Sequence, residues 1–311
     1  MIKELFDDLF PFWTFGRCAL HRSCREAGSS GSRTPSGLFP DWRPRHLMSA
    51  VFESRNDTAT GVSDVQTKPA PSARYIFVDV WRGLAIIGVV VYHFGWDLNF
   101  FGYITPDLMF SEPVTAFARV LAGSFMFLAG VSLVLAHHSK VLWRKFLKRL
   151  VKLVAAAAAI SIITYFLFPE GFIYFGVLHS IAVASVLGLA FLRLPIGLVF
   201  LASLAMLAAP LFFETSLFDP RILAWIGFAA EPPMANDFVP VFPWFGVTLA
   251  GVGSTRLFLS RRAVRDAPPK PANGAVVRRV AWIGQQTLPI YLLHQPLLFI
   301  GFVVFTIFSE T

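Results

Sequence analysis

The sequence has little charge and almost no cysteine. Charged residues make up 15% of the 311 positions, against about 25% in soluble domains, whereas 55% of the residues are hydrophobic. Cysteine occurs only at Cys18 and Cys24, so the body of the chain can form neither a disulfide framework nor a cysteine-based metal site. This composition excludes a disordered chain, a collagen and a nucleic-acid-binding domain. It also argues against a soluble enzyme and indicates a polytopic membrane protein.

The sequence also lacks the common nucleotide-binding and hydrolase signatures. It contains no P-loop, no Gly-x-Gly-x-x-Gly stretch that opens a helix, and no Gly-x-Ser-x-Gly elbow. The histidines of the apolar part fall on separate predicted helices, and His137 and His138 lie in a basic loop, so no metal site is expected. The net charge of +8 is attributed to loops that face the cytoplasm rather than to nucleic-acid binding.

Residues 1–73 differ from the rest of the chain. They hold nine of the 27 basic residues, no apolar run long enough to cross a bilayer, and stretches rich in Ser, Gly, Thr and Pro. We therefore predict a disordered basic extension. One hypothesis places the true start of translation at Met48, which would make residues 1–47 an artefact of a misplaced start. The alternative is a disordered cytoplasmic extension that includes them.

From residue 76 onward the sequence carries long apolar runs. A membrane-spanning helix needs about 20 mostly apolar residues. Seven runs come near this length: 76–96, 114–136, 146–168, 173–192, 195–213, 240–259 and 284–308. Basic residues concentrate in the loops after the second and sixth runs, which by the positive-inside rule places the N-terminus in the cytoplasm. The prediction is an all-α polytopic membrane protein with about seven transmembrane helices, because lipid cannot satisfy free backbone groups.

Four ionisable residues share one stripe on the first predicted span: Asp79, Arg82, His93 and Asp97. Helix geometry places Arg82 and His93 about 20° apart around the helix and about 16 Å apart along it. Charged residues in a membrane normally face the bundle interior or a wet cavity. An i,i+3 ion pair is a sufficient structural explanation for Asp79 and Arg82. One turn separates His93 from Asp97, so the carboxylate could orient the imidazole as a general base; the alternative is a structural histidine.

The first span also resembles a known family. Arg82, ten residues and then His93 match a pattern of membrane acyltransferases. The segment from Val78 to Ile104 resembles the start of the heparan-alpha-glucosaminide N-acetyltransferase-like catalytic domain, in its bacterial branch. The resemblance continues over three later segments: Tyr174 to Leu187, Val239 to Val252 and Leu288 to Leu298. It implies a membrane acyltransferase-like domain over residues 74–309, located in a bacterial inner membrane.

The resemblance further implies transfer of an acetyl group from cytoplasmic acetyl-CoA to an acceptor on the far side, expected to be an envelope sugar. In the lysosomal relatives the catalytic histidine lies in the loop after the first span, and asparagine stands at the position of His93. The corresponding loop here, Phe100 to Pro113, contains no histidine. The acyltransferase pattern therefore favours His93 as the catalytic base and Asp97 as its orienting partner.

Three further residues are predicted to bind substrate. His179 and Ser180, at the start of the fourth span, are expected at the depth of His93 as a second wall of the acceptor pocket; a hydrogen bond between helices is the alternative. His294, on the last span, has Tyr291 on its face and is expected deeper in the membrane, nearer the donor, in a structural or channel-lining role.

The basic residues after the second span are predicted to bind the donor. Arg82, Arg144 and Lys145 are candidate contacts for the phosphates of acetyl-CoA, since guanidinium and ammonium groups bind phosphate strongly. In the loop after the second span, basic residues recur at helical spacing: Arg144, Lys145, Lys148 and Arg149. The alternative is that these residues only set topology and touch anionic lipid.

Two functions remain open from the sequence. The first is a membrane acyltransferase in which His93 takes the proton of the attacking acceptor. The second is a small-molecule or proton-coupled transporter whose pathway is lined by the same stripe. The expected partners are the lipid bilayer, the acyl-CoA donor and a saccharide acceptor, with a second copy of the chain also considered. A retinal sensor is excluded because residues 284–308 contain no lysine for a Schiff base.

Overall fold

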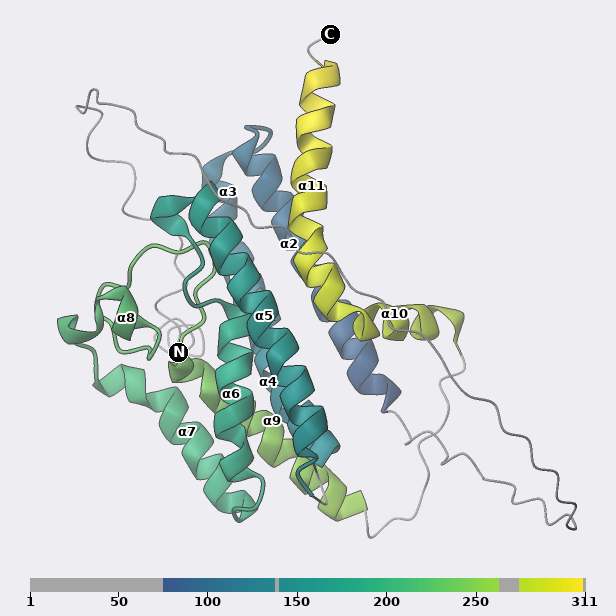
Figure 1. The fold of residues 1–311 in the computed structure, drawn as a ribbon, viewed down its shortest axis with the longest axis vertical. Coiled ribbons are helices and arrows are strands. Elements are labelled where there is room, and N and C mark those ends of the chain that lie inside the picture. The colour runs from purple at the N-terminus through teal and green to yellow at the C-terminus, as the bar shows by residue number, and fades with distance from the viewer. Residues whose placement is uncertain (1–74, 138–139, 263–273, 310–311) are drawn as a thin grey trace, which may run out of the picture. The chain divides into compact units, whose positions relative to one another are not determined.

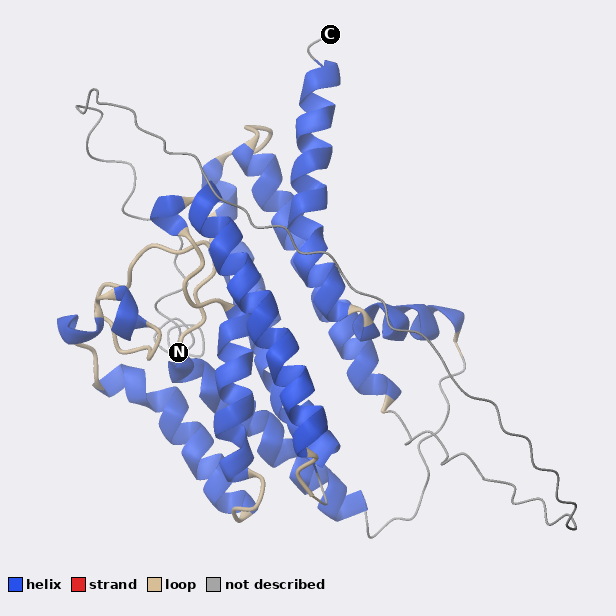
Figure 2. Cartoon of the chain, in the orientation of Figure 1, coloured by secondary structure: helices blue, strands red, loops and turns tan. Residues whose placement is uncertain are grey.

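The computed structural model describes residues 75–137, 140–262 and 274–309. The predicted extension over residues 1–73, together with the proposed start at Met48, lies outside these ranges. The described residues form helices joined by loops, with isolated bridges such as the one between Phe175 and Phe238 but no extended strand (Figure 2). The all-α prediction is therefore confirmed for the described part of the chain.

Within these ranges, seven long helices correspond to the seven predicted spans (Figure 1): α2 (Ile76–Phe100), α4 (Glu112–His137), α5 (Trp143–Leu167), α6 (Val177–Phe191), α7 (Ile196–Phe212), α9 (Val241–Arg262) and α11 (Thr287–Ser309). Shorter elements join them: α3 (Pro106–Met109), α8 (Arg221–Ala224), α10 (Ala275–Gln285) and the 3₁₀ turns η2 (Pro169–Gly171) and η3 (Ser216–Phe218).

Four of these long helices, α2, α4, α5 and α11, are long and apolar enough to cross a membrane. The helices α6 and α7 are apolar but contain only 15 and 17 residues. The chain is thus an integral membrane protein with four candidate spanning helices among its described residues. The count of seven spans and the cytoplasmic N-terminus stay predictions.

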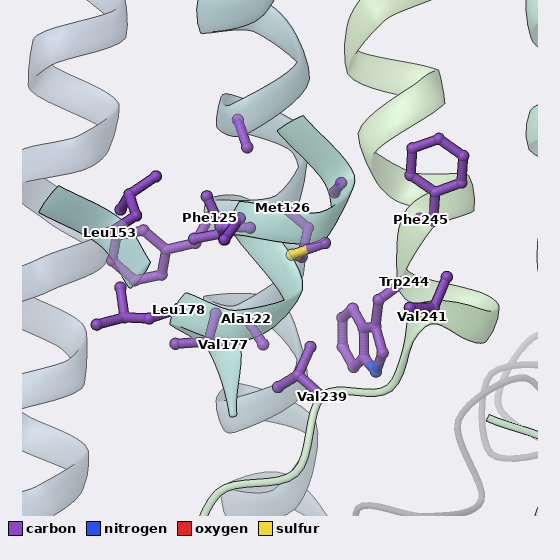
Figure 3. Packing of buried hydrophobic residues seen from close by; sticks show 14 of the residues in the cluster. Ala122, Phe125, Met126, Leu153, Val177, Leu178, Val239, Val241, Trp244 and Phe245 are labelled. Atoms are coloured by element: carbon purple, nitrogen blue, oxygen red, sulfur yellow. The ribbon is translucent and has the colours of Figure 1, made fainter. Parts of the chain in front are cut away.

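The core forms around α4, which contacts α2, α6 and α9, while α7 packs on α9. Figure 3 shows Phe125 and Met126 of α4 in one cluster with Leu178 of α6 and Trp244 of α9. Lipid tails are as apolar as these side chains, so helices in a membrane associate through close packing rather than through transfer from water. The buried face of α4 therefore fixes the positions of its neighbours.

Glycine allows two helix pairs to approach closely. A Cβ built at Gly130 of α4 would overlap the carbonyl oxygen of Thr248 in α9. In the second pair, a Cβ at Gly284 of α10 would overlap the carbonyl oxygen of Asp79, and one at Gly83 of α2 would overlap that of Val280. Small residues of this kind let helix backbones meet inside a membrane. The second contact presses α10 against α2 beside Asp79.

Helix α10 is an element that the hydropathy pattern did not separate from the basic loop before the last span. It ends at Gln285, and α11 begins at Thr287. Figure 1 shows α10 lying across the direction of α11, and both helices contact α2. The start of α2 is therefore covered by α10, and α11 begins farther along α2.

Candidate active site

A polar cluster lies where α2 meets α11. We call it the histidine cluster, and its members come from two helices: His93 and Asp97 of α2, and Tyr291, His294 and Gln295 of α11. The ring centroids of His93 and His294 are 4.9 Å apart, with the ring planes at 62°. Two histidines predicted from separate spans thus form one site.

The tautomer of His294 follows from its hydrogen bonds. Its Nδ1 lies 2.8 Å from the carbonyl oxygen of Tyr291 and 3.2 Å from that of Ile290, so Nδ1 carries the proton and donates it. In a neutral imidazole the other nitrogen is then an acceptor. Nε2 of His294 is buried and has no hydrogen-bond partner among the described residues. It is therefore available to accept a proton.

The depth expected for His294 is wrong. The last span was expected to place it deeper than His93 and nearer the donor, whereas the two rings lie side by side. The expected depth assumed that the last span starts at the membrane surface. Because α10 covers the beginning of α2, α11 starts beyond it, and its first eight residues, Thr287 to His294, bring His294 level with His93.

Asp97 contacts α11 rather than His93. Gln295 Nε2 donates to Asp97 Oδ1 over 2.7 Å, while Oδ2 is buried without a hydrogen-bond partner in the described ranges. The expected hydrogen bond from Asp97 to His93 is thus replaced by a bond between helices. Gln295 was not predicted from the sequence, although a polar residue next to His294 in an otherwise apolar run was an available signal.

A third segment reaches the histidine cluster through Asp237, in the loop between α8 and α9. Asp237 Oδ2 accepts hydrogen bonds from the backbone N–H of Val177 over 2.9 Å and from the hydroxyl of Tyr291 over 3.3 Å. Burial raises the pKa of Asp237 above its usual value, and these two hydrogen bonds act in the opposite direction. Asp237 thereby joins the start of α6 to the residue whose carbonyl orients His294.

His179 uses both ring nitrogens within the protein. Its Nδ1 accepts from the backbone N–H of Gly176 over 3.2 Å, which leaves the proton on Nε2, 3.2 Å from the Ser161 hydroxyl on α5. The next residue, Ser180, is fully buried, and its hydroxyl has no hydrogen-bond partner in the part of the chain that is described. Of these two residues, Ser180 therefore has the unused polar group.

A second group of polar side chains lies at the N-terminal end of α2. We call it the arginine cluster, and its members are Asp79, Arg82, Ser132 and Gln285. Arg82 forms an ion pair with Asp79 over 3.1 Å and also donates to the Ser132 hydroxyl. Gln285 of α10 donates to the other carboxylate oxygen of Asp79 over 3.2 Å. The i,i+3 pair considered from the sequence is present.

The other two predicted donor contacts, Arg144 and Lys145, are exposed at the start of α5. A different residue of that row, Arg149, is partly buried and lies within electrostatic range of Arg82 and of His137. The sequence did not distinguish Arg149 from the other basic residues after the second span. In the ranges described, no group of three or more acidic, histidine or cysteine residues is placed to hold a metal ion.

The two clusters are connected by one continuous helix, α2, with Arg82 and His93 about 16 Å apart along its axis. The family model for the catalytic domain of heparan-alpha-glucosaminide N-acetyltransferase matches residues 74–296 and therefore spans both clusters. The chain belongs to this family. The resemblance found in the sequence is thus confirmed. No curated protein and no solved structure matches the chain.

Membership identifies the chain as a member of a membrane acetyltransferase family whose acetyl donor is acetyl-CoA. The apolar helices agree with this assignment, because four of those described can cross a bilayer.

Proposed function

We propose that this protein transfers an acetyl group from acetyl-CoA to a hydroxyl or amine of an acceptor at the histidine cluster. The observation that carries the proposal is the pairing of His93 with His294. In that pair, Nε2 of His294 is buried, holds no proton in the neutral ring and has no partner among the described residues. A general base needs this state within reach of the proton that it removes.

The chemical step requires one proton acceptor and one leaving group. The acceptor oxygen or nitrogen attacks the carbonyl carbon of the thioester, and its proton passes to an imidazole of the His93–His294 pair. The new bond forms as the carbon–sulfur bond breaks, and the imidazolium then protonates the thiolate of CoA. His93 remains the base proposed from the sequence, while His294 has the tautomer defined by its hydrogen bonds.

Other residues are proposed in supporting roles. Asp97, held by Gln295, places a negative charge near the pair and favours the imidazolium. Ser180 offers an unused hydroxyl as a contact for the acceptor, with His179 beside it. Arg82, Arg144 and Lys145 are proposed to attract the donor phosphates.

The direction of transfer and the acceptor rest on the family. We propose that acetyl-CoA enters at the N-terminal end of α2, from the cytoplasm of a bacterium, and that the acceptor is a saccharide of the cell envelope. The description of the matching family, which names a glucosaminide, supports a sugar acceptor. The basic loops support the orientation through the positive-inside rule.

The test measures CoA release by the purified full-length protein in detergent. Acetyl-CoA is supplied with a panel of amino sugars and neutral sugars, and the wild type is compared with His93→Ala and His294→Ala. We expect release that requires an acceptor and that both substitutions reduce. Acceptor-independent release, or release that neither substitution changes, would contradict the proposal. Transport of sugar into liposomes without acetylation would favour the transporter instead.

A further inference from the structure

A second partly buried charge lies beside the arginine cluster, at Arg149 of α5. Arg82 and Arg149 approach from α2 and α5 and repel each other electrostatically. Arg82 has a carboxylate partner, Asp79. Arg149 has no hydrogen bond or ion pair to another described residue, and it lies within electrostatic range of His137. Among the described residues, Arg149 is thus without a paired carboxylate.

We propose that Arg82 and Arg149 form a binding site for a phosphate group of the acyl-CoA donor. The proposal rests on the proposed function and deepens it, because it assigns a place to the donor. It also adds the partly buried Arg149 to the proposed donor contacts, as the residue that binds phosphate together with Arg82.

The position of Arg149 on α5 explains why it faces the bundle. Phe146 and Leu153 are the buried residues nearest to it on this helix, three positions before it and four positions after it. Residues at these spacings share one helix face. Arg144 and Lys148 lie outside that face and are exposed. The side chain of Arg149 is therefore directed inward by the same packing that buries Phe146 and Leu153.

The turn between α4 and α5 holds the site in place. The backbone N–H of Leu142 donates to His137 Nδ1 over 3.2 Å, and the ring of His137 packs edge-on against Phe146. These contacts fix the last turn of α4 against the first turns of α5. Arg149 is thereby kept within electrostatic range of Arg82, which donates a hydrogen bond to Ser132 of α4.

An anion is the ligand that this arrangement favours. An unpaired charge away from water is costly, and a bound anion removes that cost. A guanidinium group presents several N–H donors in one plane, which matches the geometry of phosphate oxygens. Asp79 is paired with Arg82, so the positive charge of Arg149 has no paired carboxylate among the described residues and is left for the ligand.

The distance to the histidine cluster favours the acyl-CoA donor over a lipid headgroup. Arg82 and His93 lie about 16 Å apart along α2, on nearly the same side of the helix. The pantetheine arm of CoA is an extended chain of comparable length, with phosphate at one end and the thioester at the other. A phosphate held by Arg82 and Arg149 would place the thioester at His93 and His294.

The experiment measures binding of CoA and of pantetheine, which has the same arm without phosphates. Full-length protein is reconstituted in phosphatidylcholine nanodiscs, and binding is followed by calorimetry. Arg149→Gln is compared with Arg149→Lys and with Lys152→Gln, which removes one positive charge from an exposed position of the same helix. Thermal unfolding of each variant shows whether it is folded.

We expect Arg149→Gln to weaken CoA binding about ten- to hundredfold, the loss of one charge-assisted hydrogen bond, and to leave pantetheine binding unchanged. Arg149→Lys should restore part of the affinity, and Lys152→Gln should have little effect. Equal CoA affinity in Arg149→Gln and wild type would overturn the proposal, whatever the effect on turnover.

Two outcomes separate this site from the proposed function. If wild type acetylates sugars and Arg149→Gln does so with an unchanged KM for acetyl-CoA, the reaction stands and the phosphate site is wrong. If wild type binds no CoA, both are wrong. In nanodiscs that contain phosphatidylglycerol, native mass spectrometry reports retained lipid; loss of that lipid in Arg149→Gln with CoA binding intact would assign the site to a headgroup.

Discussion

The two ends of α2 carry similar polar residues in different states. At the N-terminal end, Asp79 has two partners, Arg82 and Gln285, and both its carboxylate oxygens are used. At the C-terminal end, three buried atoms have no partner among the described residues: Asp97 Oδ2, His294 Nε2 and Gln295 Oε1. Leaving such a group unsatisfied costs about 1–3 kcal/mol. A site that retains several of these groups is better suited to chemistry than to stability.

The two ends of α2 also differ in their proposed roles. We call the end with the arginine cluster the binding end and the end with the histidine cluster the reacting end. Guanidinium groups at the N-terminal end cannot lose a proton and are suited to holding a phosphate. Imidazoles at the C-terminal end can accept a proton and return it. Because one rigid helix carries both, the distance between the two functions is set by helix geometry.

The largest effect is expected at the reacting end. His294→Ala should lower acceptor-dependent acetyl transfer about 10²–10⁴-fold, the usual contribution of a general base. The measurement is the initial rate of CoA release with saturating acetyl-CoA. Thr306→Ala, near the C-terminal end of the same helix, is the control and should retain the wild-type rate. A similar loss in both variants would mean that α11 tolerates no truncation, and the distinction between the ends would disappear.

The next effect concerns the close packing that builds the binding end. Gly284→Leu should destabilise the fold by about 3 kcal/mol, since overpacking costs roughly that much and its Cβ would overlap the backbone of Asp79. Thermal unfolding in detergent measures this. Gly301→Leu on α11, where no atom lies within 4 Å, serves as the matched substitution and should change the melting temperature little. Equal melting temperatures would show that α10 does not pack on α2 as described.

A smaller effect is expected from the bond that joins Asp97 to α11. Gln295→Leu removes the donor to Asp97 Oδ1 and should cost about 2 kcal/mol of stability by leaving a buried carboxylate without a partner. Combining it with Asp97→Leu should recover part of the loss, because both polar groups are then gone. A double-mutant cycle in thermal unfolding gives the coupling. Strict additivity would show that the two residues do not interact.

The smallest effect is a pH dependence at Asp237. Its folded pKa is raised above the ordinary value of 3.8, so the folded state binds the proton more tightly than the unfolded state. The stability that this group contributes is therefore present below pH 3.8 and is lost as pH rises through the raised pKa. Melting temperatures of wild type should fall across this window relative to Asp237→Asn, which cannot ionise. Parallel curves for the two proteins would contradict the raised pKa.

The polar stripe of α2 was predictable from the sequence, whereas the residues of other helices that contact it were not. The stripe from Asp79 to Asp97 follows from residue spacing on a regular helix. The hydrogen-bond partner of Asp97 does not follow from residue spacing. A carboxylate on a helix face can bond to a residue one turn away on its own helix or to a residue of an adjacent helix. Gln295 is the observed partner because α11 packs directly on α2.

The misplacement of His294 has the same origin. Counting residues from the start of an apolar run gives a depth only if the run begins at the membrane surface. The pair Gly83 and Gly284 allows α10 to occupy the start of α2, so that α11 begins farther along. A short helix before the last span was not evident from hydropathy, because its exposed residues merge with the basic loop.

Sequence alone determined the all-helical membrane fold, the family, and the polar stripe of α2, because composition, motif order and helix periodicity are local properties of the chain. Tertiary structure decided which groups meet that stripe: His294 and Gln295 at one end, Arg149 and Gln285 at the other. The physical reason is that contacts between helices depend on where one helix begins relative to another. That offset is set by close packing between backbones, which no periodicity within a single helix records.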